Sequence, residues 1–167
     1  PSLQGKTLLV TGASSGIGAT YAERFARRGH DLVLVARDDS RLDKLAGRLR
    51  AECHVAIEVL PADLTRPADL AALETRLRED ARICILINNA GMAQAGSFLD
   101  QSAEAIERLI TLNTTAPTRL AAAIAPRFAQ SGTGAIVNIG SVVGFAPEFG
   151  MSIYGAPKPS FCFCRRV

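Results

Sequence analysis

The sequence of 167 residues contains no tryptophan, and aromatic residues make up only 5% of it. No basic stripe interleaves with those aromatics, so we expect no nucleic-acid surface and interpret the net charge of +3 as solvated faces. No run of ~18 consecutive apolar residues is present, which argues against a transmembrane helix or other membrane association. The first residues lack a charged segment followed by a long apolar stretch, so no signal peptide is expected.

Cysteine is scarce, with only four residues, at positions 53, 84, 162 and 164. Cys53 and Cys84 lie beside or inside apolar runs, which predicts buried thiols rather than a disulfide. Cys162 and Cys164 lack the spacing and companion ligands of a zinc site, so no metal is expected. A reducing, cytoplasmic location is the simplest interpretation.

Apolar residues make up 48% of the chain and charged residues 21%, which is typical of a globular protein. The length and the absence of repeats, low-complexity segments and linkers predict a single domain over residues 1–167. Strand-like apolar runs alternate with segments of helical periodicity. The expected strands are 6–12, 31–37, 54–64, 83–91 and 134–141, and the expected helices are 16–28, 39–51, a segment containing Leu70, Leu73 and Leu77, 102–112 and 114–130.

Strands that read as near-continuous Val, Ile and Leu runs are buried on both faces, as in parallel sheets with helices on each side. Strict alternation of strand and helix then predicts an α/β fold with an open, doubly wound, Rossmann-type parallel sheet. The strand order expected for such a sheet is 3-2-1-4-5, with a reversal between the first and fourth strands where cofactors bind.

The first expected strand ends in the glycine-rich stretch "TGASSGIG", Thr11 to Gly18. Gly12 permits a tight turn, Gly16 lets the backbone approach a pyrophosphate, and Gly18 lets helix and strand pack closely. Exposed N–H groups at the start of the helix then face the anion. The spacing G-x3-G-x-G differs from the common G-x-G-x-x-G fingerprint, and a purely structural turn is the alternative.

Two charged residues follow the next two strands. Arg37 stands where a dinucleotide fold places its ribose discriminator, and its guanidinium is suited to a 2′-phosphate; an exposed arginine at a strand end is the alternative. Asp63 follows the third strand, where it either accepts the adenine amino group or caps the following turn.

Five motifs in this order resemble the short-chain dehydrogenase/reductase family over residues 5–158. They are "TGASSGIG" at 11–18, "NNAG" at 88–91, Asn113 before a long helix, Ser141 after the fifth strand, and "YGAPK" at 154–158. The resemblance implies a nicotinamide-dependent oxidoreductase acting on a carbonyl/alcohol pair. Because Arg37 matches the residue that marks NADP-preferring members, NADP(H) is expected rather than NAD(H).

The resemblance also implies roles for individual residues. Ser141 would bond the substrate oxygen, Tyr154 would transfer the proton, Lys158 would bond the nicotinamide ribose, and Asn113 would hold a water that links the lysine to solvent. An ordinary tyrosine pKa of about 10 is too high for proton transfer near neutral pH. The ammonium of Lys158, four residues after Tyr154 on the same helical face, would lower the pKa of Tyr154. The residues expected to bind the cofactor are Gly12, Ser14, Ser15, Gly16, Ile17, Gly18, Arg37, Asp63, Leu64, Asn89, Ala90, Gly91, Tyr154 and Lys158.

The chain departs from the family pattern after Lys158. Pro159 disfavours helical angles at Lys158, and residues 159–167 have no defensible helical period, so we expect a truncation after the Tyr-x-x-x-Lys motif and a tail that is not family sequence. The fifth strand would then be an exposed sheet edge that is prone to association. A truncated, catalytically impaired NADP(H)-binding protein is the alternative function, and a scaffold protein a third. We also expect the substrate to be an apolar small molecule. In its full-length form the protein is expected to be a homo-oligomer.

Overall fold

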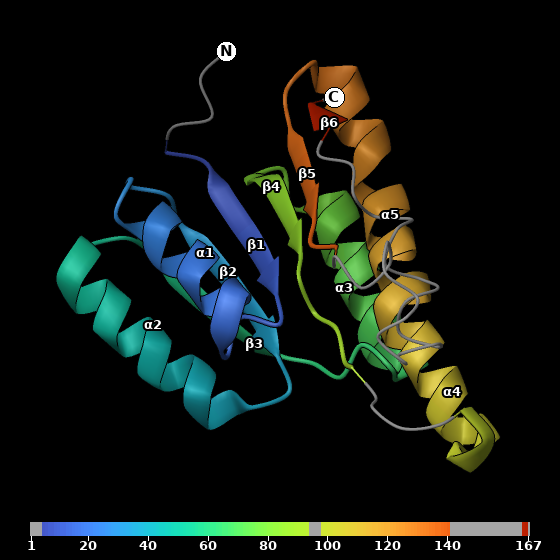
Figure 1. Cartoon of the computed structure of the whole chain (residues 1–167). Coiled ribbons are helices and arrows are strands. Elements are labelled where there is room, and N and C mark those ends of the chain that lie inside the picture. Colours follow the sequence, from blue (N-terminus) through green and yellow to red (C-terminus); the bar gives the residue numbers. More distant parts are fainter. Residues whose placement is uncertain (1–4, 94–97, 141–164, 167) are drawn as a thin grey trace.

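A parallel β-sheet forms the middle layer of the molecule in the computed structural model, which describes residues 5–93, 98–140 and 165–166 (Figure 1). The strand order is β3-β2-β1-β4-β5-β6. All strand pairs are parallel except β5 with β6, which is antiparallel. The strands are β1 (Thr7–Thr11), β2 (Leu32–Ala36), β3 (Ile57–Pro61), β4 (Ile83–Asn88), β5 (Ala135–Asn138) and β6 (Arg165–Arg166).

The three central strands are buried along their whole length, as their sequences predict. Every residue of β1, β2 and β4 is buried, because helices cover both faces of the sheet there. The parallel register places Val10 beside Leu34 on one side and beside Ile87 on the other. The predicted doubly wound sheet with strand order 3-2-1-4-5 is therefore confirmed.

Helices cover both faces of the sheet (Figure 1). Helices α1 (Gly16–Ala26) and α2 (Asp39–Cys53) pack on one face, where Leu8 and Val10 of β1 belong to their hydrophobic cluster. Helices α3 (Pro67–Glu79) and α5 (Ala116–Ser131) pack on the other, where Leu9 joins Leu73 and Phe128. The alternation of β1 side chains between two cores follows from the two-residue period of a strand. Each fully buried leucine contributes roughly 1.5–3 kcal/mol to this packing.

The helical region between β4 and β5 is one continuous run rather than two separate helices. After the short 3-10 turn η1 (Phe98–Asp100), helix α4 (Ala103–Ile110) passes through a π-helical turn, η2 (Thr111–Thr115), directly into α5. Pro117, in the first turn of α5, has no N–H to donate, so an α-helical bond to the carbonyl of Asn113 is impossible. In the wider turn just before it, the N–H of Ala116 donates to the carbonyl of Thr111, five residues earlier. Within the described residues, no helix is both long and apolar enough to cross a lipid bilayer.

The expectation of an exposed edge at the fifth strand is wrong for part of that strand. Backbone pairing with β6 covers Ala135 and Ile136, opposite Arg166 and Arg165 respectively. Sequence reasoning missed this strand because a two-residue segment carries no measurable periodicity.

Candidate functional site

A cleft of about 720 Å³ opens at the carboxyl ends of β1, β2 and β4. This is the point where the strand order reverses, since β1 lies between β2 and β4. Open α/β sheets bind their ligands at such a switch point. The cleft is lined by Gly12, Ser14, Ser15, Ile17, Val35, Ala36, Arg37, Asp38, Arg41, Ala62, Asp63, Leu64, Asn89, Ala90, Gly91 and Leu112.

The loop from Gly12 to Gly18 brings the start of α1 against the cleft. Gly12 has a φ of 65°, and a Cβ there would lie 2.8 Å from the Cα of Ala90. A Cβ on Gly18 would lie 2.3 Å from the carbonyl oxygen of Gly12, so only glycine lets α1 approach β1 this closely. The side chain of Ser15, at the N-cap of α1, makes no capping hydrogen bond, and the first turn of α1 contains no acidic residue. The first N–H groups of α1 are therefore suited to an anion.

Thr11 connects this loop to the "NNAG" segment. Its hydroxyl donates to the carbonyl of Ile87 at 3.3 Å and accepts from the N–H groups of Asn89 and Ala90, each at 3.0 Å. The side-chain amide of Asn89 donates in return to the carbonyls of Thr11 and Gly12 at 3.0 and 3.1 Å. These bonds fix two walls of the cleft to each other, because each wall satisfies polar groups of the other.

Asp63 caps a turn, as one of its two predicted roles requires. Its Oδ1 accepts from the N–H of Thr65 at 3.0 Å and from the hydroxyl of Thr65 at 2.7 Å. Burial acts to raise the pKa of this carboxyl, but the bonds from Thr65 and the charges of Arg37 and Arg108 hold the pKa below its ordinary value. Asp63 is therefore an ionised acceptor in the cleft wall, with Arg37 close enough to affect it.

Asn113 lies in the π-helical turn beside the cleft, and its side chain is committed to the backbone of Met92. The N–H of Met92 donates to Oδ1 at 3.0 Å, and Nδ2 donates to the carbonyl of Met92 at 2.8 Å. Only 2% of Asn113 is exposed. The neighbouring residue Leu112 reaches the cleft wall in its place.

Ten predicted cofactor residues line the cleft, whereas Gly16 and Gly18 shape the loop without lining it. Ser141, Tyr154 and Lys158 lie outside the described residues.

Sequence reasoning did not select six residues of the cleft wall. Two of these, Asp38 and Arg41, follow the second strand in an N-cap pattern, Asp-x-x-Arg, that was a usable signal. The six are Val35, Ala36, Asp38, Arg41, Ala62 and Leu112.

No group of three or more histidine, cysteine, aspartate or glutamate side chains with the arrangement of a metal site occurs in the described part of the chain. The polar groups that converge on the cleft are instead backbone N–H groups, hydroxyls, amides, guanidinium groups and carboxylates. Such a set suits a phosphate-bearing organic ligand.

Comparisons with known proteins agree with this fold. The family model for short chain dehydrogenases matches residues 6–162. The chain is 81% identical to a short-chain dehydrogenase from Sphingobium yanoikuyae in complex with NADPH; the two superpose with a TM-score of 0.92 over 93% of this chain and 61% of that one. It is 70% identical to the bulky-bulky ketone specific alcohol dehydrogenase from Comamonas testosteroni, with a TM-score of 0.92 over 93% of this chain and 63% of that one.

Among curated proteins, the chain is 34% identical to an uncharacterised oxidoreductase of Staphylococcus saprophyticus, over 93% of its own length and 67% of that protein's. The chain thus spans about two thirds of the length of these relatives. It belongs to the short-chain dehydrogenase family.

Proposed function

We propose that this chain is an NADP(H)-dependent oxidoreductase that transfers hydride between the nicotinamide and a carbonyl/alcohol substrate. The observation that carries the proposal is the cleft at the strand-order reversal. Residues of the glycine-rich loop, Arg37, Asp63 and the last three residues of "NNAG", far apart in the sequence, all line it. The NADPH present in the complex of the Sphingobium relative supports the choice of cofactor.

The residues of the cleft fit the parts of a dinucleotide. Gly12 and Gly18 keep the loop packed against its neighbours, and the first N–H groups of α1 would bind the pyrophosphate beside Gly16, where a Cβ would meet no atom within 4 Å. Arg37 would bind the 2′-phosphate, and the carboxylate of Asp63 would accept from the adenine amino group with the oxygen that Thr65 does not use. Leu64 and Leu112 supply apolar wall. When bound, NADP(H) supplies or accepts the hydride.

We assign the proton transfer to residues of this chain that match the family's motif positions. Ser141 would hydrogen-bond the substrate oxygen, and Tyr154 would give or take the proton at that oxygen. Lys158 would lower the pKa of Tyr154 by charge and bond the nicotinamide ribose.

Asn113 would hold the relay water through its main-chain carbonyl rather than its side chain. Its amide is occupied by Met92 on both sides. Pro117 cannot donate an α-helical hydrogen bond to that carbonyl, which leaves it better placed to accept from water.

The substrate class that we propose is a ketone, or the matching secondary alcohol, with two large apolar substituents. The support is the 70% identity to an alcohol dehydrogenase specific for bulky-bulky ketones. Small aldehydes should then be poor substrates in a panel of carbonyl compounds. A faster reaction with acetaldehyde than with diaryl or aryl-alkyl ketones would contradict this class.

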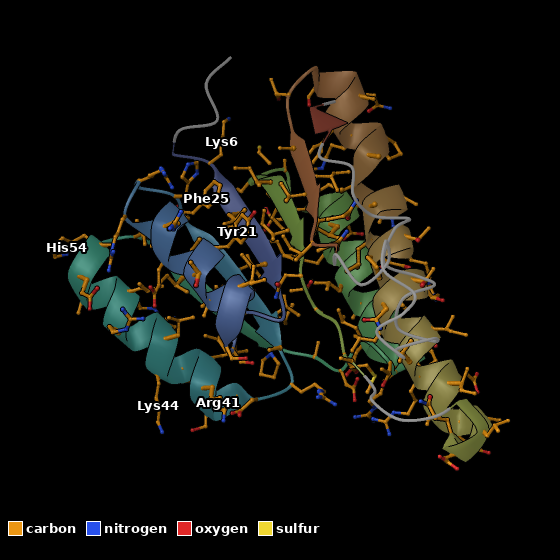
Figure 2. The ribbon with its side chains drawn as sticks, in the orientation of Figure 1. Lys6, Tyr21, Phe25, Arg41, Lys44 and His54 are labelled. Atoms are coloured by element: carbon orange, nitrogen blue, oxygen red, sulfur yellow. The ribbon has the colours of Figure 1, made fainter. Side chains whose placement is uncertain are left out.

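The test combines NADPH binding with turnover. The chain has two tyrosines, so Tyr154→Phe can be compared with Tyr21→Phe on α1, which lies outside the cleft lining (Figure 2). We expect Tyr154→Phe to retain NADPH binding through the residues of the cleft and to lose turnover by a factor of about 10² or more, while Tyr21→Phe keeps turnover. NADPH binding by the wild type without oxidation by any carbonyl would favour the non-catalytic alternative. Absence of NADPH binding would overturn the proposal.

A further inference from the structure

A second arginine lies at the corner of the cleft where β2 ends and α2 begins. Arg37, Asp38 and Arg41 all line this corner. Arg41 is the third residue of α2 and stands in its first turn. Figure 2 shows Arg41 near the end of α2 opposite to His54. Family motifs pointed only to Arg37 here, so Arg41 has no assigned role.

Asp38 holds Arg41 through both of its carboxylate oxygens. Oδ1 accepts from the backbone N–H of Arg41 at 3.0 Å and thereby caps α2. Oδ2 lies 3.2 Å from Nε of the same arginine. The first contact fixes the backbone of Arg41 and the second fixes the inner edge of its guanidinium. The side chain is thus restrained before any ligand arrives, which lowers the entropy cost of binding.

The outer edge of that guanidinium is free to bind a ligand. Within the described residues, the two terminal nitrogens of Arg41 have no hydrogen-bond partner, and 64% of the side chain is exposed. Arg37, four residues earlier, is also exposed. Two guanidinium groups with unused donors on one corner suit a phosphate dianion, which accepts several charge-assisted hydrogen bonds.

A ribose 2′-hydroxyl fits the same corner less well. Recognition of that hydroxyl needs a carboxylate with a free acceptor at the end of the second strand. Asp38 is the acidic residue in this corner, but both of its oxygens already face Arg41. Its charge is therefore used to position Arg41 rather than to select NAD(H).

We propose that Arg41 is a second ligand of the 2′-phosphate of NADP(H), and that Asp38 is the positioning residue that holds it there. The inference rests on the proposed function, because it requires a dinucleotide in the cleft. Arg37 would bind the phosphate from the end of β2, and Arg41 would bind it from the first turn of α2.

The experiment titrates NADPH and NADH, each by intrinsic ligand fluorescence, against the wild type and Arg41→Gln. Arg48→Gln is the matched control, because Arg48 also lies on α2 but pairs with Glu23 and does not line the cleft. We expect Arg41→Gln to weaken NADPH binding about tenfold or more and to leave NADH binding within twofold. Arg48→Gln should leave both unchanged, and circular dichroism melts check that each variant is folded.

A double-mutant cycle tests the role of Asp38. Asp38→Ala should weaken NADPH binding when Arg41 is present and have no such effect in the Arg41→Gln background. An equal effect in both backgrounds would overturn the positioning role.

The remaining outcomes separate this inference from the proposed function. If the wild type prefers NADPH but Arg41→Gln does not change that preference, the role of Arg41 is wrong while the oxidoreductase proposal stands. An equal loss of NADPH and NADH affinity would also exclude a 2′-phosphate contact. If the wild type binds neither dinucleotide, the proposed function itself fails.

Discussion

The side-chain amide of Asn113 and the backbone of Met92 form a reciprocal pair of hydrogen bonds. The two bonds measure 3.0 Å to Oδ1 and 2.8 Å from Nδ2, and they join the π-helical turn to the segment after β4. Asparagine is suited to this place because its amide offers one acceptor and one donor side by side. The pair therefore explains a structural need for Asn113 apart from any part in catalysis.

Asn113→Asp should destabilise the fold at neutral pH. The substitution keeps the acceptor for Met92 but turns a second oxygen toward its carbonyl, which should cost about 1–3 kcal/mol. Burial and that carbonyl would raise the folded-state pKa of the new carboxyl above its unfolded value, so stability should recover as the pH falls and the acid can donate a proton. Urea unfolding at pH 5 and pH 7.5 measures this. Equal stability of variant and wild type at pH 7.5 would show that the hydrogen bond from the amide of Asn113 to Met92 does not stabilise the fold.

Gly18→Ala should disrupt the loop at the start of α1. Its Cβ would meet the carbonyl oxygen of Gly12 at 2.3 Å and the Nδ2 of Asn89 at 2.5 Å, distances that force the helix away from β1. Overpacking of this kind costs roughly 1–3 kcal/mol and should also weaken nucleotide binding.

Gly47→Ala on α2 is the matched control, since a Cβ there would meet no atom within 4 Å. It should stabilise the protein by roughly 0.5–1 kcal/mol, because alanine loses less backbone entropy than glycine in a helix. Thermal melts of both variants measure the contrast. A Gly18→Ala protein as stable as Gly47→Ala would show that the close approach is not needed.

Thr11→Val should separate the two walls of the cleft while keeping the shape of the side chain. Only 1% of Thr11 is exposed, and its hydroxyl serves the N–H groups of Asn89 and Ala90. Leaving buried donors without an acceptor costs about 1–3 kcal/mol each. Thr11→Ser retains the hydroxyl and should lose less stability than Thr11→Val in chemical denaturation. The reverse order would indicate that the methyl group, not the hydroxyl, is what this position needs.

Asp80→Asn should remove a pH-dependent part of the stability. Hydrogen bonds from Arg82, opposed by burial and assisted by Arg76, hold the pKa of Asp80 well below its usual range. A depressed folded-state pKa contributes stability that is present above the unfolded pKa of about 3.9 and is lost as the pH falls. The variant should be less stable than the wild type by about 1–3 kcal/mol at pH 7, and the gap should close under strongly acidic conditions.

The matched control for Asp80 is Asp43→Asn, at an exposed position of α2. Guanidinium unfolding of both variants between pH 3 and pH 7 provides the comparison. A constant difference between Asp80→Asn and wild type across that range would contradict the linkage.

The sheet and most of the helices could be predicted because their signals are local and strong. Near-continuous apolar runs identify β1, β2 and β4, whose residues are all buried. The third strand was predicted to begin at residue 54 but begins at Ile57, since α2 runs to Cys53 and His54 ends it in the left-handed conformation, with a φ of 55°. Helix ends depend on such single-residue geometry, which periodicity does not report.

The candidate site was predictable where it depends on a motif and not where it depends on packing. Residues of the glycine-rich loop, Arg37, Asp63 and the last three residues of "NNAG" were identified and do line one cleft. Arg41 was missed because no family motif points to it, although the local Asp-x-x-Arg cap pattern marks its position, and the amide contacts of Asn113 depend on the path of Met92. The single domain over 1–167, the non-family tail at 159–167, the cytoplasmic location and the homo-oligomer stay predictions.

Among the residues that the structure describes, those that line the cleft fall between Gly12 and Leu112, whereas the proposed chemistry uses Ser141, Tyr154 and Lys158. Most of the residues proposed to hold the nucleotide are thus encoded before those proposed to act on the substrate, and Tyr154 and Lys158 would serve both tasks. Substitution or exchange of the later stretch can alter the reaction while the earlier one continues to recognise the same coenzyme. Such an arrangement lets a lineage explore new substrates without having to re-evolve its source of reducing power.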